Sequence, residues 1–473
     1  MKKIIFAGTI LLLALVIGST IPRVSPLVPI TFIAAIIILF ITLVRTDLGL
    51  TILIFSMLLS PELKIAQVPQ RAVVVRVDDI LLFVVFFTWL AKMAIHKQFG
   101  LLKRTPINLP IASFILACVL FSARGVIAGD VNPLKVSFYI LKFVEYFMLY
   151  FMFINNITTK EQIKRFIAAL LMTCFIICCY SFIQVISGVP RPSAPFEGAH
   201  PEPNTLAGYL LFILALVLGF FIYNNSANQR FLLGGLIIFI LFSFVQTLSR
   251  SSYLAFFPMY LTLIVLTKKG KTMLIGALLI AAFLSPILVP NIVKNRITQT
   301  FALAQRYREV GGEYVISQYE RYQKLGKPAI KQHRIFGRDL TLETSAAARL
   351  YHWQYAIERW KERPFFGYGI TGITFIDSQY FRTLAELGIV GFTIFSWLLI
   401  TIFRQALRIF QNSQDRFAQG LCLGYLAGFV GLLTQGLAAN TFIIVRIMEP
   451  FWFSTAAVMS LPMLAKAQEQ PTP

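Results

Sequence analysis

The chain has 473 residues, of which 57% are hydrophobic and 14% are charged, and its mean hydropathy is +0.73. Soluble globular chains carry about 25% charged residues, so the composition disfavours one large soluble domain, a disordered chain and a collagen-like fibre. The charges are few but biased, because 43 Lys and Arg against 21 Asp and Glu give a net charge of +22. This balance is typical of a polytopic membrane protein.

The apolar residues gather into fourteen stretches, each near the length of about 20 residues that a spanning helix needs. The first, residues 4–20, follows Met1-Lys2-Lys3 and resembles a signal peptide without a small-x-small cleavage site, so we expect an uncleaved helix. The others are expected at about 27–44, 47–61, 78–95, 107–123, 135–154, 165–187, 205–223, 231–247, 252–267, 272–290, 383–403, 418–437 and 441–463. The predicted fold is therefore all-α, with about 14 transmembrane helices.

One long polar interval, residues 291–382, interrupts this series. It is too long for an ordinary connection and is predicted to be a mostly helical extramembrane loop domain. The chain then divides into residues 1–290 with helices 1–11, the loop domain 291–382, and residues 383–473 with helices 12–14 and a tail.

The basic residues predict the orientation, because short cytoplasmic loops carry an excess of Lys and Arg. With a cytoplasmic N-terminus, 18 basic residues fall in inner segments and 8 in short outer loops, so both termini are expected inside. The interval 291–382 then lies outside, with 15 Lys and Arg against 8 Asp and Glu. Such a basic domain suits lipid headgroups or a diphosphate, and simple anchoring at headgroups explains it equally well.

The first outer segment that a plain connector would not need is a proline-rich loop, residues 188–205. Irregular backbone at membrane depth is tolerated where protein or a water-filled cavity surrounds it. Pro203-Asn204 stands directly before an apolar run and predicts a helix start with Asn204 as its cap, so a capped loop is the alternative interpretation.

The second outer segment is the short turn 247–252, which contains Arg250. An arginine at the edge of the hydrocarbon either snorkels to the headgroups or faces an interior cavity. A guanidinium is always charged and binds carboxylate or phosphate oxygens in a forked geometry. Ser251 or Ser252 is expected to cap the following helix.

The third outer segment ends the polar interval. Residues 346–363 place apolar residues at spacings of three and four and predict a helix, in which Arg349 and Trp353 share a face and after which Pro364 stops the pattern. Gly367 to Gly372 matches G-x-G-x-x-G, but no strand-turn-helix context surrounds it, so we interpret it as a turn and not as a dinucleotide site.

Taken in order, these pieces resemble the O-antigen ligase and polymerase superfamily of bacterial membrane glycosyltransferases. The resemblance covers residues 188–392. It is carried by Arg191…Pro195-Phe196-Glu197-Gly198…Pro203-Asn204, Leu248-Ser249-Arg250, Arg349-x-x-x-Trp353…Pro364-x-x-Gly367-x-Gly369 and Asp377-Ser378-Gln379-Tyr380…Ala385-Glu386-Leu-Gly388.

The resemblance implies a GT-C-like enzyme in the bacterial cytoplasmic (inner) membrane that acts at the outer face. Its donor would be a glycan on undecaprenyl diphosphate, used for O-antigen, exopolysaccharide or capsule. The acceptor would be lipid A-core in a ligase, another carrier-linked glycan in a polymerase, or a protein. The resemblance implies that the reaction needs no metal or other cofactor. The expected partners include membrane lipids and no nucleic acid.

The resemblance also suggests roles for individual residues. Arg250 and Arg349, with Arg191 as a third, would hold the diphosphate, because fixed cations stabilise the negative charge that develops on the leaving group. Ligases commonly carry a histidine near the end of the large outer loop, where this chain has Asp377. Asp377 is thus a candidate base or a helix cap, with His200, His333 and His352 as other candidates on the outer side. The remaining candidate substrate-binding residues are Glu197, Asn204, Ser249, Trp353, Gln379 and Tyr380.

The missing histidine favours a polymerase over a lipid A-core ligase without excluding either. A polytopic transporter or flippase of the same pathway is the alternative class, although we find no internal repeat of the kind that transporters often show. Three close charge pairs, at 142/145, 382/386 and 446/449, fit a functional or a structural role equally.

Overall fold

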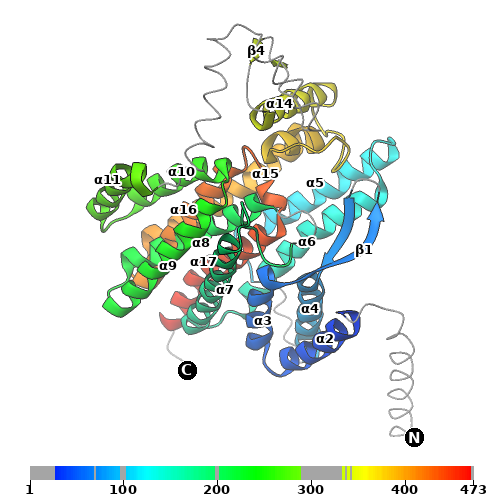
Figure 1. The fold of residues 1–473 in the computed structure, drawn as a ribbon. Coiled ribbons are helices and arrows are strands. Elements are labelled where there is room, and N and C mark those ends of the chain that lie inside the picture. Colours follow the sequence, from blue (N-terminus) through cyan, green and yellow to red (C-terminus); the bar gives the residue numbers. More distant parts are fainter. Residues whose placement is uncertain are drawn as a thin grey trace, which may run out of the picture. The chain divides into compact units, whose positions relative to one another are not determined.

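A computed structural model describes residues 27–68, 71–95, 103–197, 202–288, 333–335, 338–340 and 344–469 (Figure 1). The chain divides into two compact units, Met1–Leu101 and Leu102–Pro473. The predicted first helix at 4–20, and most of the interval 291–343, lie outside the described residues.

The first unit contains three helices and a two-stranded hairpin. Its elements are α2 (Leu27–Val44), α3 (Thr46–Leu59), β1 (Glu62–Val68), β2 (Arg71–Arg76) and α4 (Val77–Ile95). The strands pair antiparallel, with Glu62 opposite Arg76. The described chain is predominantly helical, as predicted, and this hairpin is a local addition. A short run of β-branched residues, Val73 to Val75, favours a strand but is too brief to alter a hydropathy profile.

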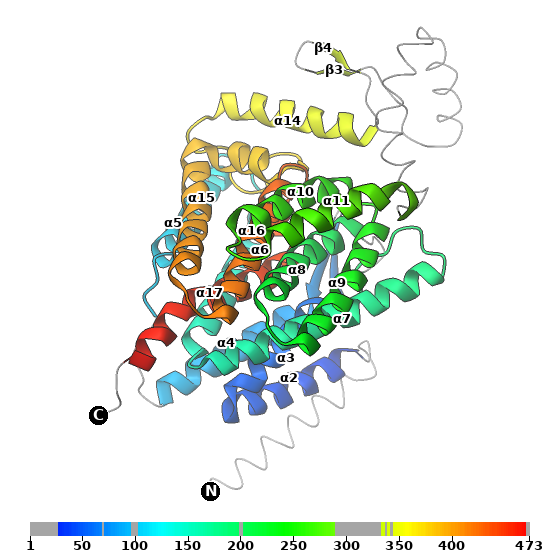
Figure 2. The ribbon, with the colours of Figure 1, turned by 90° about the vertical axis from the view of Figure 1, so that its left-hand side faces the viewer.

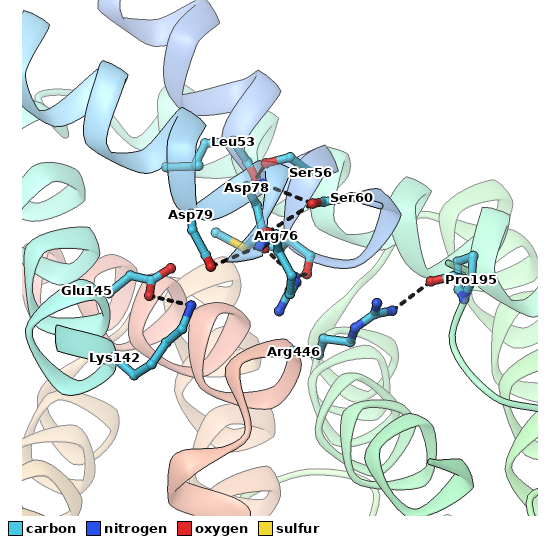
Figure 3. A network of polar contacts seen from close by, with 11 residues as sticks. Leu53, Ser56, Ser60, Arg76, Asp78, Asp79, Lys142, Glu145, Pro195 and Arg446 are labelled. Atoms are coloured by element: carbon cyan, nitrogen blue, oxygen red, sulfur yellow. Dashed lines mark hydrogen bonds and ion pairs between the residues drawn. The ribbon is translucent and has the colours of Figure 1, made fainter. Parts of the chain in front are cut away.

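A buried ion pair holds the end of α3 against the start of α4 in this unit (Figure 3). Arg76 pairs with Asp78, and its Nη2 donates to the Met57 carbonyl at 2.5 Å. The Ser60 hydroxyl lies 2.9 Å from Asp78 Oδ1. Because Asp78 and Asp79 stand in the first turn of α4, they also interact favourably with the positive end of the helix dipole.

The second unit is a helical bundle with a second small hairpin, β3 (His333–Ile335) and β4 (Arg338–Leu340). Its helices are α5 (Asn108–Ile127), α6 (Pro133–Asn156), α7 (Lys160–Ile186), α8 (Pro203–Tyr223), α9 (Ala227–Gln246), α10 (Arg250–Leu266), α11 (Lys271–Leu288), α14 (Thr344–Glu362), α15 (Gln379–Asn412), α16 (Arg416–Gln435) and α17 (Val445–Glu469). Most lie where the hydropathy pattern predicts them. The exceptions are two of the three spans predicted beyond residue 382: α15 is longer than the predicted 383–403, and α17 begins after a 3-10 turn at Thr441–Ile443.

Among the described residues, seven helices are long and apolar enough to cross a membrane. They are α5, α6, α7, α8, α9, α15 and α16. The length and composition of these helices indicate an integral membrane protein. The total of fourteen membrane spans stays a prediction.

The centre of the second unit is the contact between α8 and α16. A Cβ atom at Gly219 of α8 would lie 2.3 Å from the Gly420 carbonyl oxygen and 2.5 Å from the Gly424 nitrogen, so the two backbones touch where side chains are missing. Small residues permit this close approach of membrane helices. Tyr425 and Phe429 of α16 stack beside this contact against Phe451 of α17, and all three are fully buried.

Candidate functional site

The three motif segments meet at one end of the second unit, the end that α14 crosses (Figure 2). The start of α8, the start of α10, the end of α16 and the start of α15 are joined there by hydrogen bonds. We call this end of the bundle the motif face. The predicted site residues are all on or next to these segments.

The loop after α7 is tied to three helices. Gly188 turns the chain with φ +80°, and the Ser193 amide donates to Gln184 Oε1 of α7 at 3.0 Å. Arg191 Nε donates to the carbonyl oxygen of Thr247, which follows α9, at 3.0 Å. The structure thus brings the predicted Arg191 loop directly onto the turn that carries Arg250.

The other end of the same loop is held by a buried arginine that the motif analysis did not select. Arg446 of α17 donates from Nη1 to the Pro195 carbonyl at 2.8 Å (Figure 3). Glu197 accepts from the Glu202 backbone amide at 2.7 Å, within its own loop. The helix α8 begins at Pro203 with Glu202 in the cap position, so the prediction of Asn204 as cap is wrong. Proline is favoured at the first helical position because its φ is preset and it has no N–H to leave unpaired, and this moves the start upstream.

The turn that contains Arg250 is strained and rich in serine. Leu248 has φ +53°, in the region that non-glycine residues rarely occupy. The helix α10 starts at Arg250 with Ser249 as its N-cap residue, so Ser251 and Ser252 are not the caps that we predicted. Ser249 Oγ lies 2.9 Å from Ser252 Oγ, and Arg250 is half-buried at this first position.

Gln435, the last residue of α16, connects these segments. Its Nε2 donates to the Asn204 carbonyl at 3.2 Å and to Ser252 Oγ at 3.0 Å. The side chain fills the space beside Gly208, where a Cβ would lie 2.5 Å from Gln435 Oε1. One buried amide therefore aligns the starts of α8 and α10. Sequence analysis missed it because a single glutamine at the end of an apolar run is an ordinary boundary residue.

The start of α15 is fixed to the segment that follows α16. The Gln379 amide N–H donates to the Gly436 carbonyl at 2.9 Å, and Gln379 Oε1 accepts from the Phe442 amide at 3.1 Å. The Tyr380 hydroxyl donates to the Leu433 carbonyl at 2.6 Å. Both side chains are thus engaged inside the protein and hold α15 against α16.

Asp377 stands just outside this helix start. The N-cap position of α15 is Ser378, whose backbone is extended, so the alternative in which Asp377 caps the helix is wrong. Asp377 is half-buried, and its carboxylate makes no hydrogen bond or ion pair with the other residues that the structure describes. It remains a candidate base with an unoccupied carboxylate.

The helix α14 carries Arg349 and Trp353, and the predicted helix at 346–363 is confirmed. The Trp353 ring stacks on Phe381 of α15, with centroids 4.9 Å apart and planes at 23°. Beneath them, Ala356, Ile376 and Ala385 form a small buried cluster. This packing places the face of α14 that bears Arg349 beside the start of α15.

His352 is the other candidate base in the described part of this region. Its Nδ1 is buried and has no hydrogen-bond partner among the described residues. His200 and the side chain of His333 lie outside what the structure describes.

The glycine motif after α14 forms a turn that packs on a break in α15. Gly388 has φ +65° and ψ −173°, so the helix loses its regular backbone there. The Ile389 amide donates to the Pro364 carbonyl at 2.8 Å, and the Gly369 amide donates to the Glu386 carbonyl at 2.7 Å. The loop thus satisfies the polar groups that the break frees, as irregular backbone at membrane depth requires. The described strands do not flank this motif, in agreement with its interpretation as a turn.

A buried ion pair lies next to this break. Arg382 Nε and Glu386 Oε1 are 3.0 Å apart, both residues are almost fully buried, and Glu386 Oε1 also accepts from the Thr371 amide at 2.9 Å. The guanidinium lies over the Tyr139 ring of α6. Through these contacts, the 382/386 pair joins α15 to α6 and to the glycine turn. The 142/145 pair also forms within α6, at 2.9 Å (Figure 3).

The end of α14 carries an exposed polar cluster. Arg359 Nη1 lies 3.0 Å from Glu362 Oε2, and the Tyr368 hydroxyl donates to the same carboxylate. The hydrogen bond from Tyr368, followed by those from Arg359, lowers the pKa of Glu362. Burial and the neighbouring carboxylate raise the pKa of Tyr368.

The described residues contain no group of three or more His, Cys, Asp or Glu side chains that could hold a metal ion. The polar groups available on the motif face are therefore guanidinium groups, a carboxylate, an imidazole and amides. Such a set can bind an anion and accept a proton.

The bundle of apolar helices and this polar end together define an integral membrane protein with arginines gathered near one face. Comparison with protein-family models then gives a match to O-antigen ligase over residues 235–396. Residues 235–396 are thus similar to the O-antigen ligase family, and the predicted resemblance to the O-antigen ligase and polymerase superfamily is confirmed. The match includes the turn at 247–252, α14 and the first part of α15, whereas the Arg191 loop precedes it. No individual curated protein matched the chain.

Proposed function

We propose that this protein transfers or polymerises glycan from an undecaprenyl-diphosphate-linked donor during the synthesis of a cell-surface polysaccharide. In this proposal the motif face is extracytoplasmic, both termini are cytoplasmic and the reaction uses no metal. The acceptor is another carrier-linked glycan or lipid A-core. The contact from Arg191 to Thr247 carries the proposal, because it joins the arginine loop before the family domain to the arginine turn inside it.

The arginines provide the charge that this reaction needs. As the glycosidic bond breaks, the two electrons of that bond leave with the carrier diphosphate, and preorganised cations stabilise that charge most where water is excluded. Arg191 and Arg250 come from segments that share a hydrogen bond, and Arg349 lies one helical turn before Trp353, which packs on α15. We assign Arg250 and Arg349 to the diphosphate, with Arg191 in support.

The acceptor hydroxyl must lose its proton as it attacks the sugar, and Asp377 is the base in this proposal. Its carboxylate stands free in the described structure beside a helix start that Gln379 and Tyr380 hold in place. We therefore give Gln379 and Tyr380 a positioning role. Glu197, Asn204 and Ser249 shape the loop and turn that hold the arginines.

The test replaces Arg250 or Arg349 by Ala in a strain that depends on this protein and measures the amount of surface glycan and of protein in the membrane. We expect the glycan to be lost while the protein remains. Lys135→Ala is the matched control, since this exposed lysine at the start of α6 removes the same charge. Normal glycan in both arginine variants would overturn the assignment.

Two further variants separate the candidate bases. Asp377→Asn removes the proton acceptor with little change in shape, and we expect turnover to fall by about 10²- to 10⁴-fold. His352→Ala is the comparison. Near-normal turnover in Asp377→Asn together with loss in His352→Ala would move the role of base to α14.

The class of transfer is read from a deletion strain. Single repeat units that accumulate on the outer face support a polymerase, and complete polymer that stays on the carrier supports a ligase. Units that accumulate on the inner face would instead support a flippase and contradict the proposal.

A further inference from the structure

A large apolar cleft opens between α7 and α9. Its volume is about 1320 Å³, which exceeds the usual range of about 300–1,000 Å³ for small-molecule pockets. Its walls come from α7 and α9, and its floor includes Phe220 and Tyr223 of α8 and Phe417 of α16. All four helices are candidate membrane spans, so the cleft lies among helices that lipid surrounds.

Aromatic rings bring α7 and α9 together toward the motif face. Phe175 and Phe182 of α7 contact Phe239 of α9, with centroids 5.6 and 6.2 Å apart. Phe182 also contacts Phe242, at 5.5 Å. This part of the cleft therefore offers only hydrocarbon and aromatic surface.

The opposite end of the cleft is polar and basic. Lys164 of α7 and Arg416 of α16 line it, together with the amides of Asn225 and Gln229. Lys164 Nζ lies 5.8 Å from the Phe417 ring centroid, directly at the cleft floor. Arg416 is exposed and makes no hydrogen bond or ion pair with the other described residues.

The acidic residues at this end leave the two cations available. Glu161 lies 3.8 Å from Lys164, and Asp415 lies 3.8 Å from Lys160. The first pair is exposed and the second is partly exposed, and ion pairs near the surface contribute little to stability, so they compete weakly with a ligand. An apolar cleft that ends in an arginine and a lysine is complementary to a molecule with hydrocarbon chains and a phosphate headgroup.

We infer that this cleft binds an anionic phospholipid, with its phosphate at Lys164 and Arg416 and its acyl chains along α7 and α9. In the proposed orientation this end faces the cytoplasm, where anionic headgroups attract basic residues close to the membrane. A polyprenyl carrier fits less well. Its diphosphate would lie at the motif face, but the cleft has its basic residues at the other end, and toward the motif face aromatic rings bring α7 and α9 together. The side of the membrane and the choice against a polyprenyl carrier rest on the proposed function, whereas the match of the cleft to hydrocarbon chains and a phosphate rests on its lining residues alone.

The test measures lipid binding to the delipidated full-length protein in detergent by native mass spectrometry. The probes are phosphatidylglycerol and phosphatidylcholine with the same acyl chains. We expect wild-type protein to prefer phosphatidylglycerol, and K164A/R416A to bind it at least about 10-fold more weakly, as the loss of two cations near an anionic headgroup predicts. K269A/R408A is the control, because it removes two exposed basic residues on neighbouring elements that do not line the cleft.

A second variant tests the acyl-chain part without changing the charge. Gly235 lines the cleft, and a Cβ added there meets nothing within 4 Å, so Gly235→Trp adds a large side chain to the cleft from a position that is open at Cβ. Gly276→Trp in α11 is the control, since that glycine is equally open but outside the cleft. We expect only Gly235→Trp to lose bound phosphatidylglycerol.

Equal binding of the two lipids, or unchanged binding in K164A/R416A and Gly235→Trp, would overturn the inference. Displacement of phosphatidylglycerol by undecaprenyl phosphate at equal concentration would also overturn it and identify the cleft as a carrier site.

Discussion

The helix pairs α8/α16 and α7/α9 have comparable apolar sequences, yet they are buried to different degrees. In their apolar stretches, 78% of the residues of α8 and of α16 are buried, against 50% for α7 and 17% for α9. The difference follows from the glycines: Gly219 and Gly424 stand at backbone contacts, whereas Gly235 faces open space. Apolar content thus predicts entry into a membrane, and the position of small residues decides which helices pack.

The largest difference should come from buried aromatic residues. Phe429→Ala in α16 removes a fully buried ring and should lower the free energy of unfolding by about 3–5 kcal/mol. Phe239→Ala in α9 removes a half-buried ring at the cleft and should cost much less. Detergent-induced unfolding of the two purified variants measures both values. Equal losses of unfolding free energy would show that α8/α16 and α7/α9 contribute equally to stability, contrary to the comparison above.

A glycine pair gives the next largest effect. Gly219→Ala places a methyl group 2.3 Å from the Gly420 carbonyl oxygen and should destabilise the protein by about 3 kcal/mol. Gly235→Ala meets no atom and should stabilise α9 by about 0.5–1 kcal/mol. Thermal unfolding in micelles compares them, and a tolerated Gly219→Ala would contradict the close contact of α8 and α16.

Two glutamines of α16 allow a loss of stability to be distinguished from a loss of alignment on the motif face. Gln435→Leu leaves the Asn204 carbonyl and Ser252 hydroxyl without their amide partner and should cost about 1–3 kcal/mol. Gln419→Leu, at the opposite end of the helix, loses one hydrogen bond to the Ser413 carbonyl and should cost no more. Glycan synthesis per folded molecule should fall only in Gln435→Leu, and an equal fall in both would show that Gln435 has no special role.

The smallest effect is expected on the exposed surface of α14. Because the pKa of Glu362 is lowered in the folded state, its stabilising contribution is present above the unfolded value, near 4.5, and is lost as the pH falls through the folded value. Tyr368→Phe removes the main cause of this shift and should flatten the acid side of the stability profile. Melting temperatures between pH 3 and 7, compared with Tyr355→Phe, measure this change.

The helices could be predicted because their signals are local. The apolar run at 205–223 and Pro203 define α8 to within two residues, and Pro364 marks the end of α14. The strands at 62–76 escaped prediction because a few β-branched residues among charged and polar ones form too brief a run to alter a hydropathy profile. The break at Gly388 escaped because its cause, the loop from Pro364 to Gly369, lies about twenty residues away in the sequence.

The arginines of the candidate site could be proposed from the sequence, whereas the residues that hold their segments in place could not. Arg191 and Arg250 could be selected because charge at a membrane edge is costly, and the structure joins their segments. Gln435 and the bond from Arg446 to Pro195 could not be assigned, because each depends on which helices become neighbours. The helix caps failed for a related reason: more than one residue suited each start, and only the backbone selects among them.

The break in α15 has a consequence for genetic screens of this protein. A Cβ at Gly388 would lie 2.3 Å from the Phe365 carbonyl oxygen, and one at Gly367 would lie 2.4 Å from the Glu386 carbonyl oxygen, both at positive φ. Under the proposed function, we expect substitutions at these glycines to lower glycan synthesis as strongly as loss of an arginine, although neither residue needs to touch a sugar. A screen that scores surface glycan together with protein abundance will separate the two groups, since only the glycine variants should disappear from the membrane.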